Sequence, residues 1–231
     1  MSRSPGFRRL FDRGIGIALD RQAWLTERIG EASWGFDMGT GAMTFTLPSG
    51  EEIVTACQIL GTESEITRTW LWGWANEQSG IPGRLLEVAR GLGRAGADRD
   101  VPELSTPSFP LGEVDGHQIA VVASAVHRAA GYYRAPYEGG ALFVLLTGPE
   151  LEEPAPLPLV RFATGWSRVC SAVPDQVTDQ RAAVRAYAAH LGLTAEDQDR
   201  QTIRVFGVGG EARVQFDALD RTAAIEASAT P

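Results

Sequence analysis

The sequence contains no lysine, because all 21 of its basic residues are arginine. The absence excludes mechanisms that depend on a lysine amine: a phosphate-loop lysine, the strand lysine of protein kinases, a Schiff base with pyridoxal phosphate, and a Ser-Lys dyad. The exclusion holds whether the lack of lysine reflects the codon preference of a GC-rich genome or a functional requirement.

Cysteine and histidine are also scarce. The two cysteines, Cys57 and Cys170, lie far apart without Cys-x-x-Cys spacing, so the sequence predicts neither a disulfide framework nor a zinc knuckle. The three histidines, His117, His127 and His190, form no His-Glu-x-x-His pattern and no close pair that would clamp a metal. No Gly-x-Ser-x-Gly motif occurs either. We therefore expect no metal and no cofactor, and we assign no catalytic residue.

Long hydrophobic runs are missing as well. The longest, at residues 119–126 and 141–146, are far shorter than the roughly 20 residues that span a bilayer. The N-terminal arginines are not followed by an apolar segment before Asp20, so no secretory signal is predicted. The formal net charge of −8 argues against non-specific nucleic-acid binding. We expect a cytoplasmic protein without nucleic-acid or membrane partners.

The first third of the sequence predicts a helix followed by an antiparallel meander. Residues 15–29 carry apolar side chains at a spacing closer to that of a helix than to that of a strand. Alternating apolar residues predict strands at 34–38 and 43–47, and further strands at 53–60 and 66–75 follow turn signals. Four strands in this succession predict an antiparallel sheet.

The last of these strands contains three of the six tryptophans. Because successive side chains of a strand point to opposite faces, Trp70, Trp72 and Trp74 share one face, and the opposite face carries much smaller side chains. We expect at least two of these rings to be buried under helices, which leaves the end of the strand near Asn76 as a binding position. Arg68 lies on the same predicted face as Trp70, which allows a cation to stack on that ring.

Beyond residue 80 the pattern alternates between helices and hairpins. One helix is predicted from residue 82 to the glycines at 91–96, which end it, and a second from 115 to 130. Residues 101–112 between them are predicted to form a loop because they contain three prolines. A hairpin at 131–146 is predicted to extend the meander sheet.

The proline-rich residues 148–158 are predicted to link a first domain, residues 15–147, to a second segment at 159–217. The second segment is predicted to contain helices at 159–172 and 177–191 and a hairpin at 202–216, with a polar tail at 218–231. The whole pattern predicts an α+β fold: an N-terminal helix, a four-stranded antiparallel meander, helices packed on one face, and a C-terminal helix-helix-hairpin segment.

Residues 69–76 read Thr-Trp-Leu-Trp-Gly-Trp-Ala-Asn. Together with the hairpin at 34–45, the Gln-Ile-Leu-Gly stretch at 58–61 and residues 131–146, this stretch resembles a bacterial domain-of-unknown-function family that has a Thr-Trp-Leu-Trp-Gly/Ala-Trp-Ala-Asn strand motif. The resemblance covers roughly residues 15–147. It implies a kind of domain, and it brings no activity, substrate or catalytic residue.

Residues 91–96 satisfy the Gly-x-Gly-x-x-Gly pattern of dinucleotide-binding sites. Such a site requires the motif to follow a strand and to begin a helix, so that the phosphate meets the helix N-terminus. Here the motif is predicted at the end of a helix, where a helix C-cap explains it better. Asp115 and His117 would form a general-base pair in principle, but solvated residues at the start of a helix explain them as well.

A set of arginine, aromatic and amide side chains remains as the candidate binding site. It comprises Arg68, Trp74, Asn76, Tyr132 and Arg134. Flat aromatic faces with a few guanidinium donors suit a small anionic ligand or a side chain of a protein partner. Such residues suit a hydrophobic core equally well.

The expected function is that of a non-catalytic cytosolic binding or protein-interaction module, and an immunity or chaperone-like role fits by analogy only. The alternative is an enzyme that acts on a small molecule held by arginine and aromatic side chains. A pocket that brings two or more of Asp115, His117, Arg68 and Arg134 within hydrogen-bond reach would favour the enzyme. A flat or filled surface there would favour the binding module.

Overall fold

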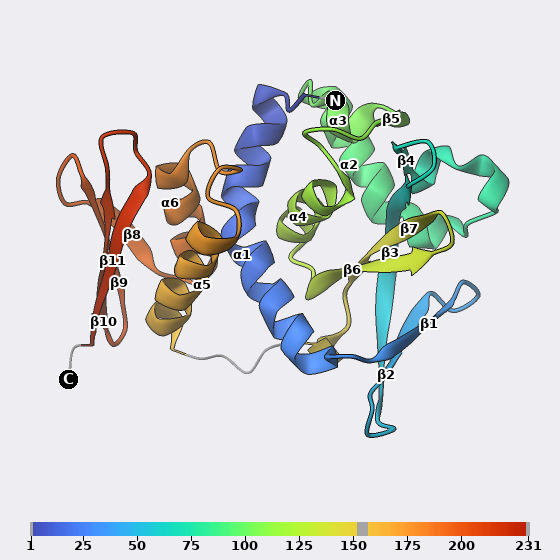
Figure 1. Cartoon of the computed structure of the whole chain (residues 1–231), viewed down its shortest axis with the longest axis horizontal. Helices are drawn as coiled ribbons and strands as arrows, with labels where there is room; N and C mark the ends of the chain where they lie inside the picture. Colours follow the sequence, from blue (N-terminus) through green and yellow to red (C-terminus); the bar gives the residue numbers. More distant parts are fainter. Residues whose placement is uncertain (1, 152–156, 230–231) are drawn as a thin grey trace. The chain divides into compact units, whose positions relative to one another are not determined.

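The computed structural model describes residues 2–151 and 157–229, and their helices and antiparallel strands form an α+β fold (Figure 1). The chain divides into two compact units. The first comprises Met1–Phe7 and Arg21–Glu152, and the second comprises Arg8–Asp20 and Glu153–Pro231. Residues 15–20, which the sequence analysis assigns to the first domain, therefore belong to the second unit.

Helix α1 (Pro5–Ile29) contributes residues to both units and begins at Pro5, not at residue 15 as predicted. Its start is set by the side chain of Ser4, which accepts a hydrogen bond from the Phe7 backbone N–H at 3.1 Å, and by Pro5 in the first turn. Phe7 and Phe11 are both buried and lie one helical turn apart. Their spacing is the helical signal that the surrounding arginines and glycines obscured.

The first unit is built on a seven-stranded sheet, and β1 to β5 are neighbours in the order of the sequence. The strand bounds are β1 Ser33–Asp37, β2 Ala42–Thr46, β3 Glu52–Ser64, β4 Thr69–Trp72, β5 Ser108–Pro110, β6 Gly131–Tyr137 and β7 Gly140–Leu146. The predicted hairpin does extend the sheet, since β7 pairs with both β3 and β6. The long strand β3 pairs with β2 through its first residues and with β4 through its last.

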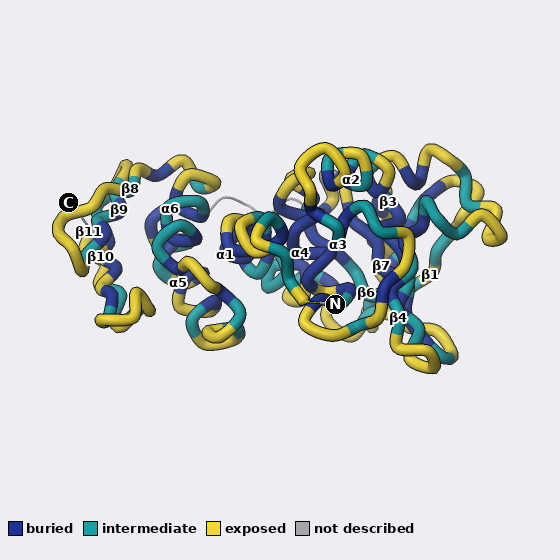
Figure 2. Tube along the Cα trace, turned by 90° about the horizontal axis from the view of Figure 1, so that it is seen from above, coloured by how far each residue is buried: buried dark blue, intermediate teal, exposed yellow. Residues whose placement is uncertain are grey.

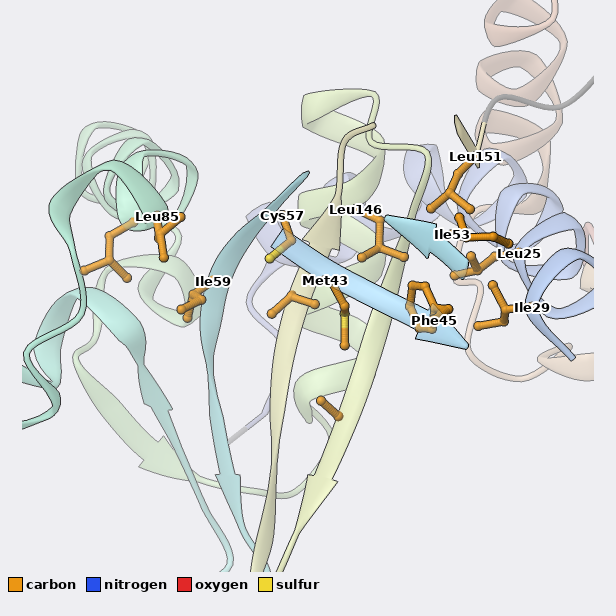
Figure 3. Packing of buried hydrophobic residues seen from close by; sticks show 13 residues of the cluster. Leu25, Ile29, Met43, Phe45, Ile53, Cys57, Ile59, Leu85, Leu146 and Leu151 are labelled. Carbon is orange, nitrogen blue, oxygen red and sulfur yellow. The ribbon is translucent and has the colours of Figure 1, made fainter. Parts of the chain in front are cut away.

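Alternating apolar side chains build the core of the first unit. Met43 and Phe45 of β2 are buried, and their intervening neighbour Thr44 is only partly buried. They pack with Ile53 of β3 and Leu146 of β7 in one cluster (Figure 3). Figure 2 shows β7 and helix α4 (Gly116–His127) buried along most of their length. The sheet is therefore covered on the side from which these residues project.

The helices between β4 and β6 correct two predictions. After the short 3-10 helices η1 (Gly73–Ala75), η2 (Glu77–Ser79) and η3 (Gly83–Leu86), helix α2 (Glu87–Asp98) runs through all three glycines that were predicted to end it. Two of them serve close packing: a Cβ on Gly93 would lie 3.3 Å from Trp74 Nε1, and a Cβ on Gly96 would lie 2.6 Å from the Leu104 Cβ. The predicted loop at 101–112 contains helix α3 (Pro102–Ser105) and strand β5.

Helix α4 confirms its prediction because its start signal is local. The Asp115 carboxylate accepts a hydrogen bond from the Gln118 backbone N–H at 3.0 Å, and the Gln118 side chain accepts one from the Asp115 N–H at 3.2 Å. This reciprocal pair is a capping box. Of the helices that the structure describes, none has both the length and the apolar character needed to cross a bilayer.

The second unit combines residues of α1 with helices α5 (Pro158–Ala172) and α6 (Gln180–His190) and a four-stranded antiparallel sheet. The strand order is β11-β10-β9-β8, with bounds β8 Thr194–Asp197, β9 Thr202–Gly207, β10 Gly210–Phe216 and β11 Thr222–Ala229. Asp12 of α1 is buried and accepts hydrogen bonds from the Thr178 N–H and hydroxyl and from the Asp179 N–H, next to the start of α6.

Two predictions in this part of the chain need comment. The tail predicted at 218–231 is wrong for residues 222–229, because β11 pairs with β10 and places Ile225 opposite Val214. The alanine-rich sequence of β11 carries little strand signal, so its conformation depends on the partner strand. Residues 152–156 of the predicted linker lie outside the described residues, whereas Pro149–Leu151 form the 3-10 helix η4 and Pro158 begins α5.

Candidate ligand pocket beside Trp74

Trp70 and Trp72 belong to the core of the first unit, as predicted. Both are 0% exposed, and their rings meet edge to face with centroids 5.5 Å apart. The Trp72 indole N–H donates a hydrogen bond to the Glu103 backbone carbonyl of α3 at 3.1 Å. In the register of β4, Trp70 lies opposite Phe109 and Trp72 opposite Gly61. These two rings are fully enclosed and offer no surface to a ligand.

Trp74 differs because strand β4 ends at Trp72 and the chain turns into η1. Gly73 at this turn is closely packed, and a Cβ there would lie 2.8 Å from the Leu86 Cδ2. The Trp74 ring remains stacked against Trp72, with centroids 6.4 Å apart and planes inclined by 20°. Trp74 is only partly buried, and it is the tryptophan of the motif that reaches a pocket.

The pocket has a volume of about 360 Å³. Its lining residues come from η1, α2 and the end of α3: Trp74, Arg90, Gly93, Arg94, Ala97 and Ser105. The four residues from α2 follow a spacing of three or four residues, which places them on one face of the helix. The pocket therefore has an aromatic wall from η1 and a wall from α2 that carries two guanidinium groups.

Gly93 lies against the indole nitrogen of Trp74. A Cβ at position 93 would be 3.3 Å from Trp74 Nε1, so a larger residue would press on the ring. Trp74 Nε1 is buried and has no hydrogen-bond partner among the described residues. A buried N–H without an acceptor costs roughly 1–3 kcal/mol, so each such group in a native protein calls for an explanation.

The two arginines of the pocket are exposed and keep most of their donors available. Arg90 Nη1 makes one long hydrogen bond, at 3.4 Å, to the Gly83 backbone carbonyl. Within the described parts of the chain, neither Arg90 nor Arg94 forms an ion pair with a carboxylate. A guanidinium presents five N–H donors in a planar fork, which matches carboxylate and phosphate oxygens.

The residues predicted as one binding site lie in separate places, and only Trp74 lines this pocket. Asn76 ends η1, where its backbone N–H donates to the Gly73 carbonyl at 3.2 Å. Arg68 lies in the turn before β4, with a positive φ of 53°, so it is not on the strand face that was predicted to place it over Trp70. Its carbonyl accepts a hydrogen bond from the Leu111 N–H at 2.8 Å.

Tyr132 and Arg134 lie on strand β6 and have partners of their own. The Tyr132 hydroxyl is 3.3 Å from His117 Nδ1, and burial together with the negative charge of Asp115 raises the pKa of Tyr132 to about 12. Arg134 forms an exposed ion pair with Glu65 at 2.8 Å, a kind of contact that contributes little to stability.

The pocket of hydrogen-bonded polar residues that would have favoured an enzyme does not form. In the described structure, no hydrogen bond or ion pair joins any two of Asp115, His117, Arg68 and Arg134. The described residues include no group of three or more His, Cys, Asp or Glu side chains that could hold a metal ion.

Sequence reasoning missed Arg90 and Arg94, although a signal was present. The two arginines and Gly93 fall on the face of α2 that does not carry the buried residues Ala89, Leu92 and Gly96. Two unpaired arginines one turn apart on such a face would have indicated a site for an anion. Because the helix was predicted to end at the glycines, Arg94 and Ala97 were not predicted to continue the helix face on which Arg90 lies.

The first unit is thus an α+β domain whose Trp-rich strand lies in the core and ends at a pocket. Residues 8–149 match a family of unknown function (DUF6882), and the chain belongs to this family. The resemblance to a domain of unknown function is confirmed, and the match extends beyond the predicted range of 15–147 at both ends. Comparisons with curated proteins and with solved structures give no match.

Proposed function

We propose that this protein is a non-catalytic binding module and that the pocket beside Trp74 is where it holds its ligand. The composition of the pocket carries the proposal. An aromatic ring and two arginines form its walls, and the described residues that line it include no carboxylate, imidazole or thiol. General acid-base catalysis most often uses a carboxylate or an imidazole next to the substrate, and a hydroxyl nucleophile is activated by such a base.

The hydroxyl of Ser105 is the one conventional nucleophile among the lining residues that the structure describes. It donates to the Val101 backbone carbonyl at 3.4 Å, within the short helix α3. A serine becomes nucleophilic when a general base accepts its proton, as in the Ser-His pair. The contact of Ser105 with a carbonyl supports a structural role.

The buried carboxylates of the first unit also support the proposal, because each is engaged in holding the fold. Glu63 accepts a hydrogen bond from the Gly116 N–H at 2.5 Å, at the start of α4. Glu103 is fully buried and accepts hydrogen bonds from the backbone N–H and the hydroxyl of Ser4, the latter at 2.8 Å. The proposal keeps the cytosolic location expected from the sequence, and a bacterial source is what the resemblance of residues 69–76 implies.

A blocking variant tests the proposal. Ala97 is exposed and lies near the end of α2, so Ala97→Trp fills the pocket with little effect on the core. Ala189→Trp is the matched control, because Ala189 is exposed and is also the penultimate residue of a helix, α6 in the second unit. A thermal-shift screen against a metabolite library is run on both variants and on the wild-type protein.

The expected result is at least one compound that raises the melting temperature of the wild-type protein and of Ala189→Trp, but not of Ala97→Trp. Bound compounds are recovered from the protein and identified by mass spectrometry. Recovery of unchanged compound after long incubation supports a binding module. Conversion of a compound that binds at the pocket would refute the non-catalytic reading, and ligands that bind equally to all three proteins would refute the assignment to this pocket.

A further inference from the structure

The chemistry of the pocket specifies its ligand more closely than the proposed function does. We infer that the Trp74 pocket takes an aromatic carboxylate, with its ring against Trp74 and its carboxylate between Arg90 and Arg94. This inference rests on the proposed function, since it assumes that the pocket is the binding site. Three properties of the described residues carry it: charge, size and the aromatic wall.

Charge is the first property. Arg90 and Arg94 are one helical turn apart, and like charges at this spacing destabilise a helix. Glu87 and Asp98 occupy helical spacings from which they could neutralise the two arginines, yet neither forms an ion pair with them in the described structure. An anionic ligand supplies the missing partner and can accept paired hydrogen bonds from a guanidinium fork.

The positive charge at the pocket contrasts with the chain as a whole, whose formal net charge is −8. A local cationic site on an acidic protein discriminates between ligands: it attracts an anion at close range, and the overall field disfavours polyanions such as nucleic acids. The geometry therefore points to a ligand of low charge, a carboxylate in preference to a polyphosphate.

Size is the second property. A volume of about 360 Å³ lies near the lower end of the range of roughly 300–1,000 Å³ typical of ligand pockets. A single ring with a short acidic arm fits such a space, whereas a dinucleotide does not. The helical placement of residues 91–96 also excludes the dinucleotide reading of their glycines, because the motif lies inside α2 and not at its N-terminus.

The aromatic wall is the third property. Trp74 is stacked on Trp72, so its indole is held in one orientation before a ligand arrives. Gly93 faces the same indole and adds no side chain to the pocket. Ring stacking stabilises a bound aromatic ligand beyond the apolar area that it buries. The Trp74 N–H is buried beside Gly93 and has no acceptor in the described structure.

Two sources offer the same chemistry: a free aromatic acid, or the C-terminal aromatic residue of a partner protein. Both present one ring and one carboxylate on a short spacer. The test uses phenylacetate and its neutral isostere phenylacetamide as the free ligands. It also uses a pentapeptide that ends in phenylalanine, with a free carboxylate or with a C-terminal amide. Binding to the full-length protein is measured by calorimetry and by quenching of tryptophan fluorescence.

The expected result is that the carboxylate form of a pair binds at least tenfold more tightly than its amide. Arg94→Gln weakens this binding at least tenfold, and Arg90→Gln does the same. Arg99→Gln is the matched control, because Arg99 is an exposed arginine at the end of the same helix that does not line the pocket. It makes the same change of net charge, so we expect a change of less than twofold. Tighter binding of phenylacetate identifies a free acid as the ligand, and tighter binding of the peptide identifies a chain terminus.

Three outcomes would overturn the inference. If a carboxylate and its amide bind equally and both lose binding in Ala97→Trp, the pocket does not discriminate between charged and neutral ligands. The proposed function would then stand. An equal effect of Arg94→Gln and Arg99→Gln would show that the carboxylate is attracted by long-range charge alone. Failure of all four probes to bind the wild-type protein would refute the ligand class, while the metabolite screen decides separately whether the pocket binds anything.

Discussion

The glycines of helix α2 allow two chemically identical substitutions to be predicted with opposite effects on stability. Replacing glycine by alanine inside a helix stabilises it by up to about 1 kcal/mol, because glycine loses more backbone entropy on folding. No atom lies within 4 Å of the position that a Cβ on Gly91 would take. We therefore expect Gly91→Ala to raise the free energy of unfolding by about 0.5–1 kcal/mol.

Gly96 faces helix α3 and has no such space. A Cβ there would lie 2.6 Å from the Leu104 Cβ and 3.0 Å from the Val101 carbonyl oxygen. Neither atom can rotate away, because one is fixed to the backbone and the other belongs to it, so α2 and α3 would have to separate. Overpacking of this kind costs roughly 1–3 kcal/mol. At the upper end of that range, and after the gain of about 1 kcal/mol in helix propensity, Gly96→Ala should lose about 2 kcal/mol.

Urea unfolding followed by tryptophan fluorescence measures both effects, because four of the six tryptophans, Trp34, Trp70, Trp72 and Trp74, lie in strands or turns of the first unit. The two variants should differ by about 3 kcal/mol, which corresponds to roughly 6–12 °C in melting temperature for a chain of this size. If Gly96→Ala were as stable as Gly91→Ala, the close approach of α2 and α3 at Gly96 would be refuted.

Three further predictions concern titration, reactivity and a buried carboxylate. Burial and the charge of Asp115 raise the pKa of Tyr132 from 10.0 to about 12, so the native state holds the phenolic proton more tightly than the unfolded state. The resulting contribution to the free energy of unfolding, about 3 kcal/mol, is present below pH 10 and is lost as the pH rises through about 12. Titration of the absorbance at 295 nm, together with urea unfolding at each pH, checks this prediction. Burial also raises the pKa of the Cys57 thiol to about 11, so Cys57 should react with Ellman's reagent at pH 8 only at the rate of unfolding. Rapid labelling of Cys57 would contradict its position in the core. Asp12→Ala removes the acceptor of two backbone N–H groups and of the Thr178 hydroxyl, so it should lower the free energy of unfolding of the second unit by about 3 kcal/mol. An unchanged midpoint of urea unfolding would refute this role of Asp12.

Local signals explain which parts of the fold could be predicted from the sequence. Helix α4 has a capping box at its start, and the β6–β7 hairpin has Gly139 with a positive φ of 83° in its turn. Both signals act within a few residues, so a single sequence carries them. The α+β class follows from the periodicity of the elements and did not depend on how they pack.

Three of the errors share a different cause, since the segments concerned owe their structure to a distant part of the chain. Gly93 and Gly96 predict the end of a helix when the sequence is taken alone. In the structure they lie inside α2, where Trp74 packs against Gly93 and Leu104 against Gly96. Strand β11 is set by its pairing with β10, although its own sequence is alanine-rich. The pocket joins η1, α2 and α3, and no spacing along the sequence reveals that Trp74 and Arg94 line one space.

Helix α1 has a consequence for the order in which the chain folds. Residues 8–20 are made before the residues of the second unit that surround them, from 157 onward. Phe11, Ile15 and Asp12 must therefore wait for the synthesis of α5 and α6 before they are buried. Contacts between residues far apart in the sequence are slow to form, because a long loop has to close. The second unit thus completes its core only after α5 and α6 are made, and until then its part of helix α1 is a segment that a chaperone would have time to meet.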